Sequence, residues 1–184
     1  DLNATIEKVR YLVTDAIERQ LVSDVPIGTF LSGGLDSSII SAVAANSLKR
    51  RGEKLQTFSV TYKDNEKFFK KSFFQPDSDE KYIQIMTEYL GSDHHNVVIG
   101  NDELAQALYD AVEARDLPGM ADIDSSLLLF CGEIKKHVTV ALSGECADEI
   151  FGGYPWFYRE DLLNLDMFPW ANSLDLRRSV MSKA

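Results

Sequence analysis

Two stretches of the chain combine serine, glycine and acidic residues in an order that suits phosphate chemistry. The first, residues 32–38, reads Ser-Gly-Gly-Leu-Asp-Ser-Ser, and the second, residues 143–149, reads Ser-Gly-Glu-Cys-Ala-Asp-Glu. Each follows an apolar run and leads into a stretch typical of a helix. Adjacent glycines permit a turn with positive φ, and the N-terminus of the following helix presents unpaired N–H groups to an anion. Both stretches are therefore predicted to be strand–loop–helix turns that contact phosphate.

Asp36 stands inside the first loop, where a carboxylate would repel phosphate. No lysine follows the glycines, so the loop differs from the Walker A motif, in which a lysine reaches the terminal phosphates. A carboxylate beside bound phosphates is explained if it holds a divalent cation, and Mg²⁺ prefers oxygen ligands. We therefore expect Asp36 to bind a Mg²⁺ ion that bridges the carboxylate and the phosphates.

The second loop carries three carboxylates within five residues, Glu145, Asp148 and Glu149. If its helix begins near Cys146, Asp148 and Glu149 lie in the first turn and could face the same phosphates as Asp36. Acidic residues in a first helical turn are often only capping or dipole partners, and for this loop alone that interpretation is favoured. Two such loops at the ends of adjacent strands shift the balance toward a shared phosphate site.

The elements that must position these loops follow from apolar periodicity. Spacings of three and four residues predict helices over 4–22, 39–48, 80–90, 101–115 and 122–137. Runs rich in β-branched and aromatic residues predict strands over 27–31, 55–61, 95–99 and 138–142. Asn101 and Asp102 are expected to cap the helix that begins there. The stretch 62–78 has no clear period and is predicted to be a loop or flap.

Strands that alternate with helices predict the fold class. The expected architecture is an α/β, Rossmann-like, doubly wound parallel sheet, whose ligands lie beyond the carboxyl ends of the strands. Both serine-glycine loops fall at such ends. We expect a leading helix in residues 1–24, a nucleotide-binding core in residues 25–160, and the start of a further part in residues 161–184.

The first loop resembles the pyrophosphate-binding loop of the ATP pyrophosphatases, the PP-loop proteins of the adenine-nucleotide alpha-hydrolase type, which release AMP and pyrophosphate. The second, extended by Phe-Gly-Gly-Tyr up to Tyr154, looks like a signature of glutamine-dependent asparagine synthetases. The resemblance covers most of residues 1–160 and implies ATP and Mg²⁺ as cofactors. It implies that Glu145 is the base that assists ammonia attack, and that Asp36 and Asp148 hold Mg²⁺ and the departing pyrophosphate.

The same resemblance implies which residues bind the nucleotide. The predicted ATP- and pyrophosphate-binding residues are Phe30, Leu31, Ser32, Gly33, Gly34, Asp36, Ser37, Ser38, Val60, Asp79, Ser143 and Gly144. Asp79 has an equal alternative as the cap of the helix over 80–90. Arg159 could approach the phosphates, but a solvated surface arginine is the favoured interpretation.

The segment 118–126 departs from the family pattern, because it lacks the threonine and arginine residues that engage the substrate amino acid. Asp122, Asp124, Ser125 and Glu149 are candidates for substrate contacts, unless this branch recognises its substrate differently. His94, His95 and His137 lack partners at metal-ligand spacing, which favours surface or core roles.

The composition of the chain limits which partners it could bind and in which compartment it could function. The net charge of −10 over 184 residues argues against nucleic acid as a partner. Two cysteines, Cys131 and Cys146, are too few for a secreted disulfide scaffold, so a reducing cytoplasm is expected. The sequence shows no leader and no apolar run long enough to cross a membrane. Because it opens at Asp1 and lacks a counterpart to the family's N-terminal glutaminase domain, we expect a truncated synthetase domain.

Together these features predict ATP-dependent asparagine synthesis. Aspartate and ATP would give β-aspartyl-AMP and pyrophosphate, and ammonia from a separate glutaminase domain would convert the adenylate to asparagine and AMP. The truncated chain is expected to be inactive alone, and the full-length protein could form a homodimer. One alternative is a related ligase with another acyl substrate, similar to a β-lactam synthetase. The other is a nucleotide-binding module without catalysis, which would not need Glu145.

Overall fold

The structure, a computed structural model, describes residues 1–70, 78–166, 168 and 178–179. The chain divides into two units, residues 1–144 and 145–184, which are described separately. The first unit contains, in chain order, α1 (Leu2–Gln20), β1 (Ile27–Phe30), α2 (Leu35–Lys49), β2 (Gln56–Tyr62), α3 (Asn65–Phe68), α4 (Glu80–Leu90), β3 (Asp93–Ile99), α5 (Asn101–Arg115), α6 (Ala121–Ile134) and β4 (Val140–Leu142). The predicted alternation of strands and helices is confirmed.

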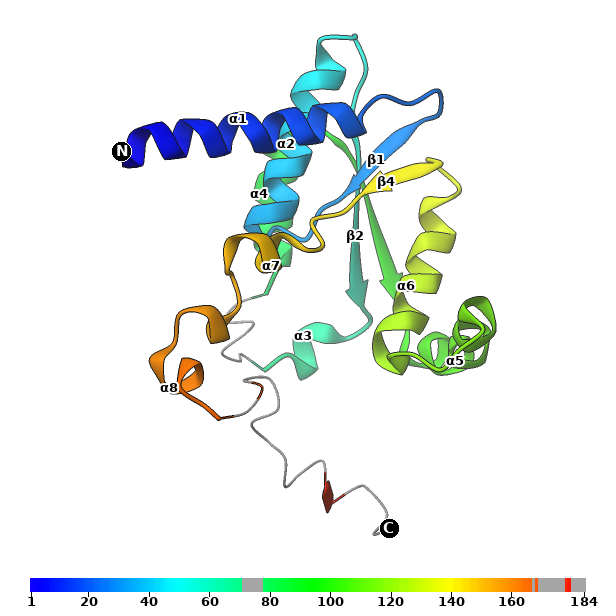
Figure 1. The fold of residues 1–184 in the computed structure, drawn as a ribbon. Coiled ribbons are helices and arrows are strands. Elements are labelled where there is room, and N and C mark those ends of the chain that lie inside the picture. The colour runs from blue at the N-terminus through cyan, green and yellow to red at the C-terminus, as the bar shows by residue number, and fades with distance from the viewer. Residues whose placement is uncertain (71–77, 167, 169–177, 180–184) are drawn as a thin grey trace. The chain divides into compact units, whose positions relative to one another are not determined.

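The four strands form one sheet in the order β3-β2-β1-β4, and every neighbouring pair is parallel (Figure 1). Thr29 in the centre of the sheet pairs with Thr57 on one side and Leu142 on the other. Parallel neighbours require crossover connections, which the helices provide. The prediction of a doubly wound α/β sheet of Rossmann-like type is confirmed.

Helices cover both faces of the sheet, with α1, α2 and α4 on one side and α5 and α6 on the other (Figure 1). Successive strand residues point to opposite faces, so each face has its own apolar core. The core beneath α2 consists of Leu21, Ala44, Leu48 and Leu55, and the core beneath α6 consists of Phe58, Phe130, Ile134 and Val138. Leu21, Leu55 and Val138 stand just before β1, β2 and β4, so both cores lie toward the amino ends of the strands, opposite the loops that follow their carboxyl ends.

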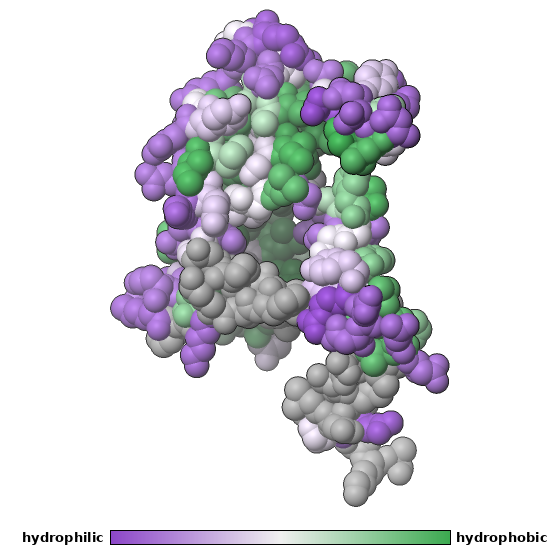
Figure 2. All heavy atoms as spheres, turned by 90° about the vertical axis from the view of Figure 1, so that its left-hand side faces the viewer, coloured by the Kyte–Doolittle hydropathy of each residue, from purple (hydrophilic) through white to green (hydrophobic). Residues whose placement is uncertain are grey.

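The helix α1 packs only at its C-terminal end. Ile17 and Leu21 are buried, whereas Leu2 is 74% exposed and Ile6 and Leu12 are also exposed. The N-terminus of α1 points toward the face shown in Figure 2, on which apolar residues lie exposed among hydrophilic ones. The helix is confirmed, but the described residues do not cover the apolar face of its first three turns.

This difference along α1 gives a stability test. Leu21→Ala should lower the free energy of unfolding by about 2–5 kcal/mol, because it leaves a cavity in the core beneath α2. Leu2→Ala removes the same atoms from an exposed position and should change it by no more than about 0.5 kcal/mol. Chemical denaturation of both variants measures the difference. Equal losses would contradict the packing described for α1.

Several element ends differ from those predicted. The cap of α5 is Gly100, whose N–H donates to the Glu103 carboxylate at 2.7 Å, so Asn101 and Asp102 are already helical. The strand β4 begins at Val140, because the N–H of Val138 still donates to the Ile134 carbonyl at the end of α6. The predicted loop over 62–78 contains the short helix α3, and residues 71–77 lie outside the described residues.

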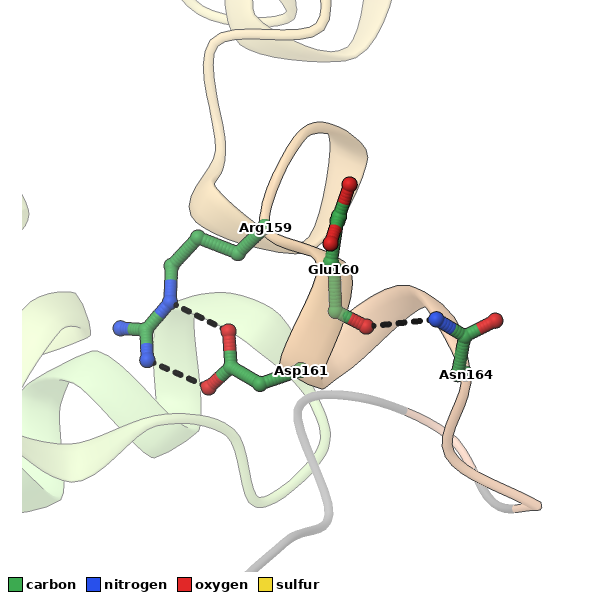
Figure 3. Close-up of polar contacts among 4 residues, drawn as sticks. All are labelled: Arg159, Glu160, Asp161 and Asn164. Carbon is green, nitrogen blue, oxygen red and sulfur yellow. Dashed lines mark hydrogen bonds and ion pairs between the residues drawn. The ribbon is translucent and has the colours of Figure 1, made fainter.

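Between residues 145 and 166, the second unit forms the short helices α7 (Ala147–Phe151), η1 (Pro155–Phe157) and α8 (Glu160–Leu163). Arg159 Nε donates to Asp161 Oδ1 at 2.9 Å, and Asn164 Nδ2 donates to the Glu160 carbonyl (Figure 3). This ion pair favours the surface interpretation of Arg159. In neither unit do the described residues include a helix that is both long and apolar enough to span a bilayer.

Candidate functional site

The first serine-glycine loop connects β1 to α2 and is held by hydrogen bonds of its own serines. The hydroxyls of Ser32 and Ser37 lie 2.9 Å apart, and Ser37 Oγ donates to the Gly34 carbonyl at 3.2 Å. The N–H of Leu31 donates to the Phe58 carbonyl at 2.7 Å, which ties the start of the loop to β2. Ser37 is buried, so in this structure its hydroxyl holds the loop.

Gly33 meets both a conformational and a spatial requirement. Its φ of +78° lies in the left-handed region that favours glycine. A Cβ atom at this position would lie 2.7 Å from Tyr82 Cβ and 2.9 Å from the backbone nitrogen of Ile83. The loop therefore lies directly against the first turns of α4.

Substitution of Gly33 should be costly for that reason. Gly33→Ala should lower the free energy of unfolding by about 2–5 kcal/mol, from backbone strain and overpacking together. Gly52 has a similar φ of +76° with nothing within 4 Å, so Gly52→Ala isolates the strain and should cost about 1 kcal/mol. Thermal unfolding of the two variants measures both values. Equal costs would show that the contact with α4 is unimportant.

The second serine-glycine loop leaves the same end of the sheet as the first, because β4 lies beside β1 and parallel to it. A Cβ atom on Gly144 would lie 3.1 Å from Asp36 Cβ and 3.2 Å from the backbone nitrogen of Ser37. The backbone at Gly144 therefore lies against the first turn of α2. Two segments more than 100 residues apart in the sequence adjoin at this point.

A cavity of about 340 Å³ opens at the carboxyl ends of β1 and β2, beside the first loop. Five of the predicted nucleotide-binding residues line it, namely Phe30, Leu31, Ser32, Val60 and Asp79. Its volume lies within the range of small-molecule sites, and the aromatic and polar residues around it suit a nucleoside. Sequence reasoning missed Tyr62, Asn65 and Phe130 as lining residues, because they come from β2, α3 and α6 and carry no local motif.

Asp79 occupies the position before α4 for which sequence reasoning left two roles open. Its carbonyl accepts hydrogen bonds from the N–H groups of Tyr82 and Ile83, but its side chain makes no capping hydrogen bond. The residue also lines the cavity. Asp79 thus lines the cavity without capping α4 through its side chain, and its contact with a nucleotide stays a prediction.

The carboxylates of the second motif lie in the second unit. Asp148 and Glu149 are in the first turn of α7, after Cys146 with a φ of +70°. Tyr154 Oη donates to Glu149 Oε1 at 3.1 Å. This hydrogen bond, with the charges of Asp148 and Glu145, raises the pKa of the Tyr154 phenol. Three acidic side chains of the second motif thus act on one tyrosine, and Glu149 alone is hydrogen-bonded to it.

Gly153 explains how the segment after α7 folds back toward Asp148. Its N–H donates to the Asp148 carbonyl at 3.0 Å, and a Cβ atom there would collide with the Asp148 carboxylate. The described residues contain no group of three or more histidine, cysteine or acidic side chains that could hold a metal. Mg²⁺ often uses only one or two carboxylates together with substrate phosphates, so Asp36 and Asp148 are suitable donors. The approach of Asp148 to Asp36 stays a prediction.

Of the candidate substrate residues in the first unit, Asp124 has a partner from a neighbouring helix. Arg115 Nη1 donates to Asp124 Oδ1 at 2.6 Å, and the Asp124 side chain is only 10% exposed. The segment 118–126 lacks an arginine of its own, and sequence reasoning missed that Arg115 from α5 reaches it. Ser125 is buried, whereas the side chain of Asp122 is not among those that the structure describes.

A parallel α/β sheet with a glycine loop after its first strand, and a cavity beyond the strand ends, defines a Rossmann-like nucleotide-binding domain of the PP-loop type. The family model for asparagine synthase matches residues 8–184, and the chain belongs to this family.

Known relatives agree with this assignment. The chain is 54% identical to asparagine synthetase (glutamine-hydrolyzing) 3 of Bacillus subtilis, over 97% of this chain and 29% of that relative. It is 40% identical to asparagine synthetase (glutamine-hydrolyzing) 1 of the same organism, over 85% of this chain and 22% of the relative. It is 33% identical to asparagine synthetase B of Escherichia coli, over 83% of this chain and 28% of the relative. The chain thus spans less than a third of the length of these relatives.

Proposed function

We propose that this chain carries the synthetase half-reactions of an asparagine synthetase. ATP adenylates the side-chain carboxylate of aspartate, which gives β-aspartyl-AMP and pyrophosphate, and ammonia then displaces AMP to give asparagine. The observation that carries the proposal is the adjoining of the two serine-glycine loops at the first turn of α2, beside a cavity of nucleoside size. Membership of the asparagine synthase family supports the same reaction.

In this proposal the adenosine of ATP occupies the cavity beside the first loop. Phe30, Leu31 and Val60 supply apolar contacts, and Asp79 lies at the rim. The phosphates extend toward the loop from Ser32 to Ser38, where the N-terminus of α2 favours negative charge. Gly144 lies against the first turn of α2, which suits a ligand contacted by both loops, with Ser143 as a further donor.

Asp36 and Asp148 would hold Mg²⁺, which neutralises charge on the departing pyrophosphate. Without a cation, Asp36 would oppose phosphate binding, because it stands in the first turn of the helix whose N-terminus receives the anion. The carboxylates of α7 have the oxygen donors that Mg²⁺ prefers.

Glu145 would act on the attacking ammonia. A carboxylate is a poor acylating agent, and adenylation replaces an oxide leaving group by AMP. As the nitrogen attacks the acyl carbon it becomes positively charged and must lose a proton. A carboxylate within hydrogen-bonding reach can accept that proton, and Glu145 immediately follows the loop proposed to contact the nucleotide.

Aspartate is the proposed acyl substrate, with Asp122, Asp124, Ser125 and Glu149 as candidate contacts. Arg115 extends this set, because its guanidinium already lies beside Asp124 and could bind a substrate carboxylate. Ammonia would come from a glutaminase, since the names of the relatives describe glutamine-hydrolyzing enzymes. A cytoplasmic location and a homodimer of the full-length protein belong to the same proposal.

The substrate is tested by exchange of labelled pyrophosphate into ATP with the complete gene product that carries this sequence. Because adenylation is reversible, aspartate should stimulate exchange at least about tenfold over glutamate, since one methylene changes specificity by about 10–200-fold. Exchange that responds to another carboxylic acid and not to aspartate would support a related ligase instead. Nucleotide binding without exchange for any acid would indicate a non-catalytic module.

A further inference from the structure

His94 on β3 bonds β2 through both of its ring nitrogens. Nδ1 lies 2.9 Å from Thr57 Oγ1, and Nε2 lies 3.0 Å from Ser59 Oγ. Thr57 and Ser59 are 0% and 4% exposed, so solvent does not compete for these hydroxyls. Sequence reasoning gave His94 only a surface or core role, and the synthetase reaction proposed above does not use it.

The neighbouring groups define which nitrogen carries the proton. Ser59 donates its hydroxyl hydrogen to Asn96 Oδ1 at 3.0 Å, so the hydrogen between His94 and Ser59 must come from Nε2. Nδ1 lies 2.9 Å from Thr57 Oγ1, which in turn lies 2.9 Å from the Ser92 hydroxyl. Burial, followed by the neighbouring His95, lowers the pKa of His94, which favours the neutral ring. With its hydrogen on Nε2, the neutral ring accepts from Thr57 through Nδ1.

The hydrogen bonds continue from His94 to the proposed adenosine cavity. Ser59 and Thr61 both line that cavity, and Asn96 joins them by accepting from Ser59 and donating to Thr61 Oγ1 at 3.1 Å. The hydrogen bonds thus alternate between the two strands, from His94 on β3 to Ser59 on β2, Asn96 on β3 and Thr61 on β2, toward the carboxyl ends of the strands. A substitution of His94 can therefore affect the cavity wall through this series of hydrogen bonds, without any contact between His94 and the nucleotide.

The charged groups around His94 come from two elements. Glu80 and Glu88 of α4 line a hollow of about 310 Å³ together with His94 and Asn96, and His95 follows on β3. Protonation would make Nδ1 a donor, which reverses the hydrogen bond with Thr57, and the glutamates would then attract the imidazolium. The ring would then lose its acceptor for Thr57 and be drawn toward the glutamates of α4, away from Ser59.

We propose that neutral His94 is a positioning residue for nucleotide binding, which fixes the Ser59 and Thr61 wall of the cavity by donating from Nε2 to Ser59. This inference rests on the proposed function, because it requires that the cavity binds ATP. It assigns His94 no contact with the nucleotide.

Two substitutions of His94 distinguish the contribution of Nε2 from that of Nδ1. The amide of an asparagine reaches the position of Nδ1 and that of a glutamine reaches the position of Nε2, so His94→Gln keeps a donor for Ser59 and His94→Asn does not. ATP affinity, measured by calorimetry on the complete gene product, should fall about fivefold to tenfold in His94→Asn, as expected for one lost hydrogen bond. His94→Gln should stay within about twofold of the unchanged protein, because its donor to Ser59 is retained.

The pH profile of the unchanged protein provides a second readout that needs no substitution. The pKa of His94 is lowered from its ordinary value near 6.5, so its neutral form persists at neutral pH and is lost on acidification below that value. ATP affinity should decrease there more steeply than in His94→Gln, which shares every other titrating group. Equal affinities of the two variants at neutral pH, or parallel pH profiles, would overturn the inference. Absence of ATP binding by the unchanged protein would instead overturn the proposed function.

Discussion

Glu145→Gln will greatly slow asparagine synthesis while ATP binding survives. Glutamine keeps the size of the side chain but cannot accept a proton from the attacking ammonia. Loss of a general base lowers the rate by about 10²–10⁴-fold, and we expect a loss in this range for ammonia-dependent synthesis. ATP affinity should change by no more than about twofold, because the residues proposed to bind adenosine and phosphates lie elsewhere.

The measurement is ammonia-dependent formation of asparagine, beside calorimetry with ATP, in the complete gene product. Glu160→Gln is the matched control, since Glu160 is an exposed glutamate at the start of α8 in the same unit. The control should retain full synthesis. Retention of synthesis by Glu145→Gln would remove the residue from catalysis and would favour the non-catalytic alternative.

Gly144→Val will weaken ATP binding by about 100-fold, the scale expected when a preorganised set of phosphate donors is lost. The Cβ position of Gly144 is already 3.1 Å from Asp36 Cβ, and the two methyl groups of valine need more space than the backbone there provides. The second loop must therefore move away from the first turn of α2. If the triphosphate lies between the two loops, it loses contacts with one of them.

Gly132→Val is the control for this prediction, because Gly132 lies in α6 and a Cβ atom there meets nothing within 4 Å. Both variants place a β-branched residue at a glycine, but only one changes the distance between the loops. Calorimetric titration with ATP should separate them, and thermal unfolding should show that both fold. Equal ATP affinities would contradict a shared phosphate site.

The sheet could be predicted from the sequence because its strands are short apolar runs between clear helical periods. The strands over 55–61 and 95–99 reappear as β2 and β3 with ends shifted by one or two residues. Apolar periodicity predicts that a helix has an apolar face but not which part of the protein covers that face, as α1 illustrates. Its period is correct, yet Leu2, Ile6 and Leu12 are exposed in this structure.

The two serine-glycine loops could be predicted from the sequence, because their glycine, serine and acidic residues follow recognisable local patterns. The contacts between segments that are distant in the sequence could not be predicted. Arg115 reaches Asp124 from the preceding helix, and the network of His94 joins neighbouring strands at positions 35 and 37 residues apart. The ring centroids of His95 and His137 likewise lie 4.0 Å apart, although the two residues are distant from each other in the sequence. Such pairs depend on register and packing, which no local pattern encodes.

The central claim is that both serine-glycine loops hold one triphosphate through one metal ion. A crystal structure of the complete gene product with Mg²⁺ and a non-hydrolysable ATP analogue tests it most directly. The account predicts adenine in the cavity beside Phe30 and Val60, phosphates between the two loops, and one Mg²⁺ within about 2.1 Å of oxygens from both Asp36 and Asp148. Phosphates bound away from either loop, or Asp36 and Asp148 on opposite sides of the nucleotide without a shared metal, would contradict it.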